Sequence, residues 1–294
     1  MKIAVGIATI GRRDILSQAV KVIAEQARLP DRLVISVVNE KDVDTEYLKQ
    51  FPVAASVVQS AIGSAAQRNR IITELFDADV VVFFDDDFFP CNDYLVQIER
   101  IFLAHDDVMA TTGRPIEDGI NGPGLGVEHA RSVIAQAAQA ASSELEVTRT
   151  VGTYGCNMAF RLAPIREHAI LFDENLPLYA WQEDIDFSAQ VARYGRVIES
   201  SLLKGVHLGN KGARSSGVRF GYSQIANPVY LARKGTMGWS YALSLMCRNL
   251  AANLLRSANP EPWVDRRGRL KGNALALLDV ATGRVRPGRI LQLG

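Results

Sequence analysis

The sequence predicts an α/β fold in which a mostly parallel central sheet is flanked by helices. Over about the first 90 residues, apolar strand-like runs alternate with segments of helical periodicity, a pattern typical of βαβ units. The run Val80–Phe84 is apolar at every position, which indicates a strand buried on both faces. Three carboxylates, Asp85–Asp87, follow it directly. They form the most informative stretch of the chain.

The bulk composition is that of a folded protein with a sizeable core. The 294 residues suffice for one large domain or two modest ones, and 48% of them are hydrophobic. A formal net charge of +1 argues against a general nucleic-acid binder. The three cysteines form no C-x-x-C pair, which favours a reduced, cytoplasmic chain without a disulfide framework. The apolar start is interpreted as a strand rather than a signal peptide, and no run approaches the ~18 apolar residues that cross a bilayer.

Each element of the first half has a local signal. Strands are expected at residues 2–9, 33–38, 53–58 and 79–87, which are apolar and β-branched. Helical spacing of apolar residues begins after Asp14, a suitable N-cap, and a second helix is expected at 63–75.

The second half alternates less regularly. Helices are expected at residues 93–103, 129–145 and 181–194, and strands at 108–112, 152–161 and 196–199. Residues 113–126 hold five glycines and two prolines, so they are expected to form a loop. That loop either contacts substrate or only connects two elements.

The acids that follow Val80–Phe84 point to a metal site. Unpaired buried charges are costly and like charges repel, so Asp85–Asp87 are not expected to continue the strand into the core. A divalent cation would hold them together, and carboxylate oxygens suit Mg²⁺ or Mn²⁺ beside the phosphates of a ligand. The carboxyl end of a parallel strand is also where open α/β sheets bind ligands. The alternative is a solvated acidic turn.

A second acidic group, Glu183, Asp184 and Asp186, opens the helix that follows Trp181. The helix dipole alone favours acids in a first turn, which explains one or two of them. Three acids in four residues exceed what capping needs. Further on, His207 lies between apolar residues. From that context alone it is more often a core residue than a metal ligand.

Residues 211–294 are expected to form a C-terminal extension. Lys211, Arg214 and Arg219 lie among Gly and Ser in a basic loop that either folds over phosphates or stays solvated. The segment Trp239–Leu255 carries an apolar stripe: Trp239, Leu243, Met246, Leu250 and Leu254. This amphipathic helix could dock on the domain, pair two subunits or lie on a membrane surface. Core packing is the expected use, and the last forty residues give no clear prediction.

Taken together, residues 1–210 resemble the family 2 glycosyltransferases, which have the GT-A fold. Five motifs carry the resemblance, in the family's order: Thr9-Ile10-Gly11-Arg12, Gly63 with Arg68-Asn69, Asp85-Asp86-Asp87, Gly155-Cys156-Asn157-Met158-Ala159-Phe160-Arg161, and Glu183-Asp184-Ile185-Asp186-Phe187. Each motif is weak alone, and the ordered set is specific. The resemblance implies a nucleotide-binding half, 1–90, an acceptor-binding half, 91–210, and a helical extension, 211–294.

The resemblance also implies a reaction. A sugar would move from a nucleoside-diphosphate sugar, a UDP-sugar being favoured, to a hydroxyl acceptor with inversion and with the help of Mg²⁺ or Mn²⁺. Asp87 and His207 would ligate the metal, and Trp181 and Glu183 would contact the acceptor. The donor would be bound by Thr9, Arg12, Asn39, Arg68, Asp85 and Asp86. One position departs from the family: in place of an Asp near the end of the second strand stand Asn39 and Glu40, which leaves the base open.

Transfer to a hydroxyl needs a general base, because the attacking oxygen must lose its proton. Asp184 is the predicted base, since Glu183 and Asp186 beside it would raise its proton affinity. A sugar-1-phosphate nucleotidyltransferase is a second interpretation, although the loop after the first strand is short for that chemistry. A non-catalytic nucleotide-sugar-binding protein is a third.

The family resemblance also implies the partners of the protein. The expected acceptor is a saccharide or lipid-linked saccharide in cell-surface polysaccharide synthesis. It would be met in the cytoplasm or by peripheral contact at the inner face of the membrane. No nucleic acid partner is expected, and the oligomeric state is left open.

Overall fold

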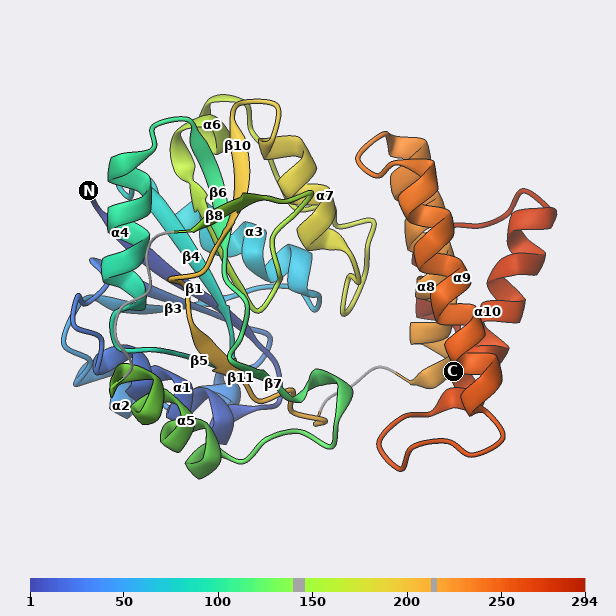
Figure 1. Ribbon diagram of the computed structural model, residues 1–294, viewed down its shortest axis with the longest axis horizontal. Coiled ribbons are helices and arrows are strands. Elements are labelled where there is room, and N and C mark those ends of the chain that lie inside the picture. The colour runs from blue at the N-terminus through green and yellow to red at the C-terminus, as the bar shows by residue number, and fades with distance from the viewer. Residues whose placement is uncertain (140–145, 213–215, 294) are drawn as a thin grey trace.

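The computed structural model describes residues 1–139, 146–212 and 216–293. Its centre is an eight-stranded sheet with the order β3-β2-β1-β4-β9-β6-β10-β8 (Figure 1). The strands are β1 (Ile3–Thr9), β2 (Arg32–Val37), β3 (Ala55–Gln59), β4 (Val80–Asp85), β6 (Val108–Thr112), β8 (Val147–Arg149), β9 (Asn157–Arg161) and β10 (Arg196–Ser200). The apolar run of β4 is almost fully buried, as predicted.

The sheet is mostly parallel. Strands β3, β2, β1 and β4 run in one direction, and β6 and β10 share it. Strand β9, between β4 and β6, and the edge strand β8 run the other way. Parallel neighbours need crossover connections, and helices provide them on both faces. The predicted α/β class is therefore confirmed.

Helices bury alternate residues of each strand. One face carries α1 (Arg13–Ala24) and α4 (Tyr94–Ala104), and the other carries α3 (Ser64–Glu74), α6 (Leu162–Glu167) and α7 (Glu183–Val191). Along β4, Val82 and Phe84 belong to the first core, whereas Val81 and Phe83 belong to the second. This alternation is what the pleat of a doubly covered strand requires. The short helix α2 (Thr45–Lys49) leads into β3.

A second, three-stranded sheet follows the end of β4. It pairs β11 (Gly205–His207) with β5 (Phe88–Pro90) on one side and with β7 (Glu117–Asp118) on the other. Helix α5 (Val127–Gln139) packs against it together with α1. Because His207 pairs with Phe88 in this sheet, the histidine lies next to the acids that precede β5.

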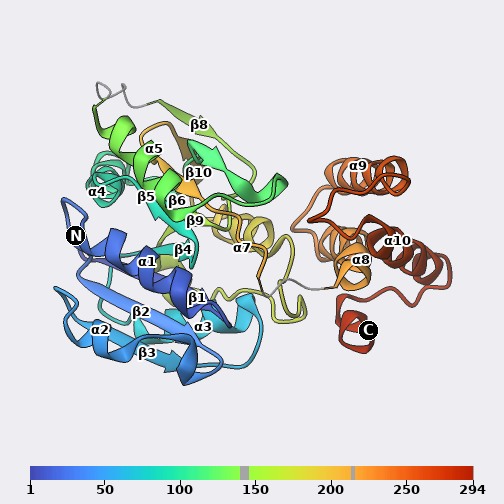
Figure 2. The same cartoon turned by 90° about the horizontal axis from the view of Figure 1, so that it is seen from below.

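Three helices form the C-terminal extension: α8 (Gly217–Lys234), α9 (Trp239–Arg256) and α10 (Arg266–Ala281). Both views place them on the α7 side of the central sheet (Figure 1 and Figure 2). Helices α8 and α10 approach so closely that a Cβ atom added at Gly221 would lie 2.1 Å from the backbone oxygen of Arg269. A short 3₁₀ helix (Pro287–Gln292) ends the chain. Within the described ranges, no helix has the length and apolarity needed to cross a membrane.

Several expected elements differ from the observed ones. The strand expected at 152–161 begins only at Asn157, and the loop expected at 113–126 contains β7 and a 3₁₀ helix, Gly119–Asn121. The N-cap of α1 is Arg12, and Asp14 lies inside the first turn. The helix expected at 129–145 is α5, and residues 140–145 lie outside the described part of the chain.

The expected apolar stripe of α9 packs only in part: Met246 packs against the small core of the extension, and Leu250 is half-buried. Trp239, Leu243 and Leu254 are 50%, 52% and 58% exposed. The buried residues of α9 are instead Ala242, Leu245 and Asn253. The Asn253 amide donates hydrogen bonds to side chains of both α8 and α10, so polar contacts turn this helix away from its apolar pattern.

Candidate active site

The candidate site lies at the carboxyl ends of β1 and β4. These strands are parallel neighbours with Ala8 opposite Asp85, so the residues after β1 meet the acids after β4. Gln67 of α3 fixes this edge, because its buried amide donates hydrogen bonds to the backbone oxygens of Thr9 and Ser36. The ends of β1 and β2 are thereby held together beside the acids.

Asp86 is buried, contrary to the expectation that the acids leave the core: it is 4% exposed, and Asp87 is 2% exposed. The expectation fails because each acid has partners from distant parts of the chain. Asp86 accepts hydrogen bonds from the hydroxyl of Thr9 at 2.7 Å and the guanidinium of Arg12 at 2.9 Å. Burial raises the pKa of Asp86 to about 6, although Arg12 opposes the rise. Arg12 also donates to the backbone oxygen of Gly212, which ties the loop after β11 to the site.

Asp87 is held by donors from the opposite side. Its Oδ2 accepts the backbone N–H of Asn210 at 2.7 Å, and its Oδ1 lies 3.3 Å from Nε2 of His207. Burial by itself raises the pKa of Asp87, but His207 and Arg12 outweigh it and hold the pKa below its usual range. Asp87 is therefore a carboxylate at neutral pH.

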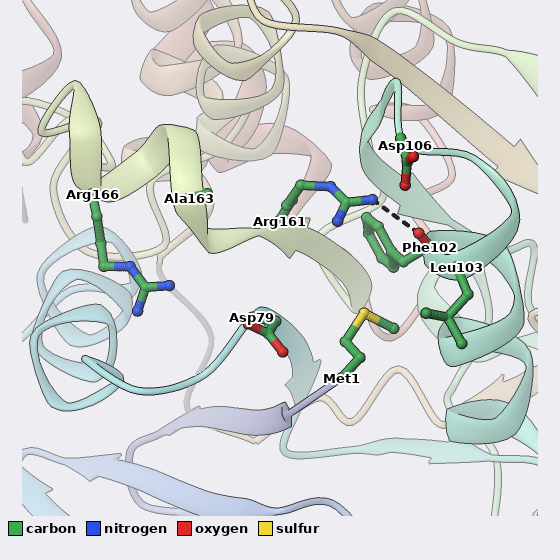
Figure 3. A pocket seen from close by; sticks show the side chains of 8 residues that line it. All are labelled: Met1, Asp79, Phe102, Leu103, Asp106, Arg161, Ala163 and Arg166. Atoms are coloured by element: carbon green, nitrogen blue, oxygen red, sulfur yellow. Dashed lines mark hydrogen bonds between the residues drawn. The ribbon is translucent and has the colours of Figure 1, made fainter.

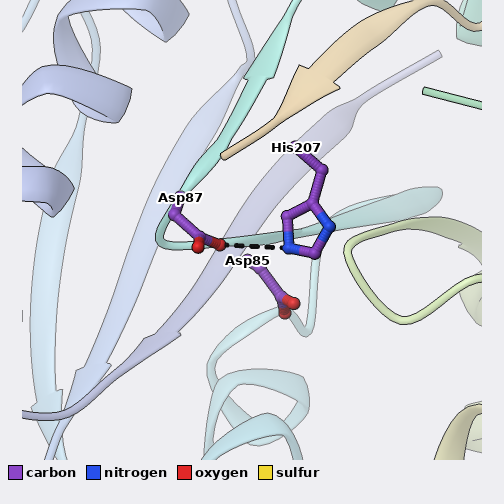
Figure 4. A group of neighbouring side chains, drawn as sticks. All are labelled: Asp85, Asp87 and His207. Carbon is purple, nitrogen blue, oxygen red and sulfur yellow. Dashed lines mark ion pairs between the residues drawn. The ribbon is translucent and has the colours of Figure 1, made fainter. Parts of the chain in front are cut away.

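His207 completes a group of three possible metal ligands. One ligand atom each of Asp85, Asp87 and His207 lie within 4.8 Å of one another, and Figure 4 shows both acids beside the imidazole. Its Nδ1 lies 2.9 Å from a carboxylate oxygen of Asp118. Burial lowers the pKa of His207, but Asp118 and Asp87 overcome this and raise it to about 10. Without a metal the ring is a cation, and a metal ion would take the place of its proton.

This donor set fits a divalent cation. Carboxylate oxygens suit Mg²⁺ and Mn²⁺, and an imidazole nitrogen shifts the preference toward the transition metal. Asp118 would orient His207 from behind, as carboxylates commonly do for metal-bound histidines. His207 is buried, as its sequence context suggests, but its polar partners are carboxylates.

A buried cation, Arg68, joins the strand-end acids to the acids of α7. Its guanidinium pairs with Glu183 and donates to Asp85 Oδ1 at 3.0 Å and to the backbone oxygen of Gly155 at 3.2 Å. Burial by itself lowers the pKa of Arg68, but the charges of Glu183 and Asp85 outweigh this effect and raise the pKa above its usual value. Burial also raises the pKa of Glu183, against the pull of Arg68. This Arg68 bridge connects two motifs that are about 100 residues apart in the sequence.

Asp184 lies next to this bridge and is half-buried. Its Oδ2 accepts the backbone N–H of Gly155 at 3.0 Å, and its Oδ1 accepts that of Ile185 at 2.9 Å. A Cβ atom at Gly155 would lie 3.4 Å from Asp184 Oδ2 and 3.9 Å from Arg68, so Gly155 lies directly against both side chains. Burial raises the pKa of Asp184, which makes its carboxylate a stronger base.

The loop before α7 has unusual backbone angles. Leu178, Ala180 and Gln182 have positive φ values of 61°, 49° and 79°. Non-glycine residues rarely adopt this conformation, and such strain is concentrated at ligand sites. Trp181 lies in this loop. Its backbone oxygen accepts a hydrogen bond from Asn227 of α8, and its ring lies 5.9 Å from that of Phe220, so α8 supports this loop.

Asn39, the predicted base contact, is exposed and caps a 3₁₀ helix, Glu40–Asp42. Asp42, the last residue of that helix, was not predicted as a site residue. Asp42 is 4% exposed, and its Oδ2 has no hydrogen-bond partner among the residues that the structure describes. An acid three residues beyond Asn39 was the available signal, but its burial could not be read from the sequence.

Residues of the basic loop expected at 211–219 form hydrogen bonds with two different parts of the chain. Lys211 donates to the backbone oxygens of Gly119 and Ile120. Arg219 belongs to the first turn of α8 and donates to the backbone oxygen of Leu293 at 2.6 Å. Arg214 lies outside the described residues. A role of this segment at phosphates stays a prediction.

A surface cavity of about 320 Å³ lies at the opposite, amino-terminal ends of β1 and β4, beside Met1 and Asp79 (Figure 3). Its arginines are engaged with backbone: Arg161 donates to the oxygen of Phe102, and Arg166 donates to that of Ala78. This cavity is therefore separate from the candidate site.

No family model and no curated protein matches the sequence. Solved structures do match. They include the mannosyltransferase PcManGT from Pyrobaculum calidifontis with GDP-Man and Mn²⁺, at 16% identity and a TM-score of 0.56, covering 99% of this chain and 85% of that one. S. aureus TarS 1–349 with UDP-GlcNAc matches at 13% identity and a TM-score of 0.54, covering 97% and 93%.

GalNAc-T7 with UDP, GalNAc and Mn²⁺ matches at 11% identity and a TM-score of 0.57, covering 97% of this chain and 59% of that one. A longer TarS structure is covered over 40% of its length. These similarities define the class of the structure: it has the GT-A fold of nucleotide-sugar glycosyltransferases. The predicted fold is confirmed at this level.

Replacing Arg68 tests whether the bridge holds buried charge. Arg68→Gln leaves Glu183 and Asp85 without their shared cation, so the free energy of unfolding should fall by about 3–5 kcal/mol in urea denaturation. Arg70→Gln is the matched control on the same helix, because Arg70 forms a partly exposed pair with Glu74, and it should cost less than about 1 kcal/mol. Equal, small losses for both variants would contradict a buried bridge.

Proposed function

We propose that the chain is an inverting glycosyltransferase of the family 2 type that moves a sugar from a nucleoside-diphosphate sugar to a hydroxyl acceptor. The observation that supports this most is the Arg68 bridge, which puts the donor-side Asp85 and the acceptor-side Glu183 in one ion-pair network. Asp184 adjoins the same network through Gly155. The residues that would stabilise the leaving group and the residue that would accept the proton thus lie at one place.

The donor would be held at the strand ends. Asp85, Asp87 and His207 would hold Mn²⁺ or Mg²⁺, and a bound divalent cation would stabilise the negative charge that develops on the departing diphosphate. The mannosyltransferase and GalNAc-T7 structures both contain Mn²⁺ with a donor or its nucleotide, which supports this use of the acids. Thr9 and Arg12 would keep Asp86 in place beside the nucleotide.

Asp184 would act as the general base. As the acceptor oxygen bonds to the anomeric carbon, its proton passes to the Asp184 carboxylate. The bond from that carbon to the diphosphate oxygen breaks, and its electron pair leaves with the nucleoside diphosphate. Attack from the face opposite to the leaving group inverts the configuration. Two backbone N–H donors orient the carboxylate, and Trp181 and Glu183 would border the acceptor.

Residues 1–90 would then form the nucleotide-binding half, 91–210 the acceptor half and 211–294 the extension that supports the acceptor-side loop. The acceptor class, a saccharide or lipid-linked saccharide of surface polysaccharide synthesis, is carried over from the family resemblance. Incubation with UDP- and GDP-sugars tests the function directly. Release of nucleoside diphosphate supports transfer, pyrophosphate would indicate a nucleotidyltransferase, and no turnover would favour a non-catalytic binding protein.

The base assignment is tested by Asp184→Asn in the same assay. Because the amide cannot accept the proton, nucleoside-diphosphate release in the presence of acceptor should fall by about 10²–10⁴-fold while donor affinity is kept. Glu167→Gln, a change at an exposed carboxylate at the end of α6, serves as control and should leave both unchanged. Near-normal release by Asp184→Asn would remove Asp184 from the mechanism.

The metal assignment is tested by Asp87→Asn. The amide keeps the shape and can still accept the hydrogen bond from Asn210, but it withdraws a charged ligand. Calorimetric binding of UDP or GDP should therefore lose its dependence on Mn²⁺ and weaken by more than about tenfold. Asp106→Asn is the control. If EDTA and Mn²⁺ made no difference to nucleotide binding by the unmodified protein, the metal role would be refuted.

The base contact has two candidates, Asn39 and Asp42. A buried carboxylate oxygen without a partner needs a donor, and the N–H edge of uracil or guanine could supply one. Asp42→Asn should therefore abolish the difference between nucleoside diphosphates in a thermal-shift screen with Mn²⁺, whereas Asn39→Ala should do so if the amide reads the base. Retained discrimination in both variants would exclude both residues.

A further inference from the structure

Charge is strongly segregated along this nearly neutral chain. Residues 211–294 contain fourteen Lys and Arg but three Asp and Glu, a formal charge of +11, so the preceding 210 residues carry −10 against the total of +1. Between Glu199 and Glu261 there is no acidic residue at all. A basic segment of this kind is attracted to anionic surfaces, and nearby acids do not cancel the attraction.

Helix α9 presents the apolar part of this extension to solvent. Leu255 is 77% exposed, and Trp239, Leu243 and Leu254 are each at least half exposed. On a helical projection Leu243 and Leu254 fall on the side away from the buried Ala242 and Leu245, together with the exposed Ser240, Ser244, Cys247 and Ala251. Trp239 and Leu255 lie at the two margins of this outward face. The outward face of α9 thus combines four exposed large apolar side chains with two serines and contains no acidic residue.

A positive charge borders this face. Arg248 is exposed and lies beside Tyr241 on one flank of the outward face. Arg256 ends α9 and pairs with Glu261. Exposed leucines, a Trp and a Tyr near one end, and an arginine at the edge suit a helix that lies in the headgroup region of a bilayer.

We propose that the outward face of α9 docks on an anionic lipid bilayer, with its leucines in the acyl boundary and Arg248 at the headgroups. Charge complementarity selects this occupant: an acid-free apolar face in a segment of charge +11 fits an anionic membrane. An apolar partner without negative charge would leave Arg248 unmatched.

Docking would bring the bilayer to the acceptor side of the site. Helix α8 holds the loop of Trp181 through Asn227. Burial raises the pKa of Tyr241 at the start of α9, and the charge of Asp184 adds to the rise, which puts this helix end near the candidate base. If the proposed function holds, the acceptor class favoured by this placement is one with a lipid anchor.

The test is co-flotation of the full chain with vesicles of phosphatidylcholine, with and without phosphatidylglycerol. Binding is expected to the anionic vesicles and to weaken as NaCl rises from about 0.1 M to about 1 M, over which the Debye length falls from about 10 Å to about 3 Å. Arg248→Ala should weaken partitioning about fivefold, and Leu254→Ser with Leu255→Ser by more than about tenfold. All three sites are exposed, so the variants should stay folded.

Matched controls are Leu103→Ser, an exposed leucine of α4, and Lys49→Ala, an exposed lysine of α2; neither should change flotation. Absence of binding to anionic vesicles at low salt, or binding that the α9 variants do not weaken, would overturn the proposal. So would a dimer in light scattering that Leu254→Ser with Leu255→Ser dissociates, because a second copy would then cover the face. Nucleoside-diphosphate release without vesicles is measured separately, so a failed docking proposal is distinguishable from a failed function.

Discussion

The site depends on cations that neutralise a cluster of buried carboxylates. Asp86, Asp87 and Glu183 lie inside the protein near one sheet edge, where unpaired charges would be strongly unfavourable. Arg12, Arg68 and the His207 ring each bring a positive charge from a different part of the chain. The Arg68 bridge matters most, because it holds a strand-end acid and a helix-start acid at once. Breaking it would free two carboxylates and separate the two halves of the candidate site.

This arrangement explains which features could be predicted from the sequence. The buried strand Val80–Phe84 is a local signal, and it was predicted correctly because the pattern alone specifies a doubly covered strand. The burial of Asp86 and Asp87 was not predicted, since their partners Arg12, His207 and Asn210 lie 74 to 123 residues away. Ion pairs of this kind have no periodicity, and ordered motifs indicated the site only through resemblance.

The helices of the C-terminal extension were harder to predict, because their sequences reflect how they pack on one another. Helix α8 contains Gly217, Gly221 and Pro228, which weaken a helical pattern in isolation. The close packing of α8 on α10 explains Gly221 of α8 and Gly272 of α10, since added Cβ atoms there would each lie 2.1 Å from backbone oxygens of the other helix. The core packing expected for the apolar stripe of α9 is found only in part, because Trp239, Leu243 and Leu254 are exposed while Met246 packs against the core of the extension. A pattern gives the amphipathic face of a helix and does not tell whether protein or another apolar phase covers it.

The most direct test of the central claim, that Asp85, Asp87 and His207 hold a divalent cation at the donor site, is a crystal structure with Mn²⁺ and a nucleoside diphosphate. Anomalous scattering at the manganese edge would locate the ion. A peak at about 2.0–2.6 Å from Asp87 and His207 ligand atoms, with the diphosphate against it, is the predicted result. A manganese peak elsewhere, or nucleotide bound with His207 still paired between Asp87 and Asp118, would contradict it.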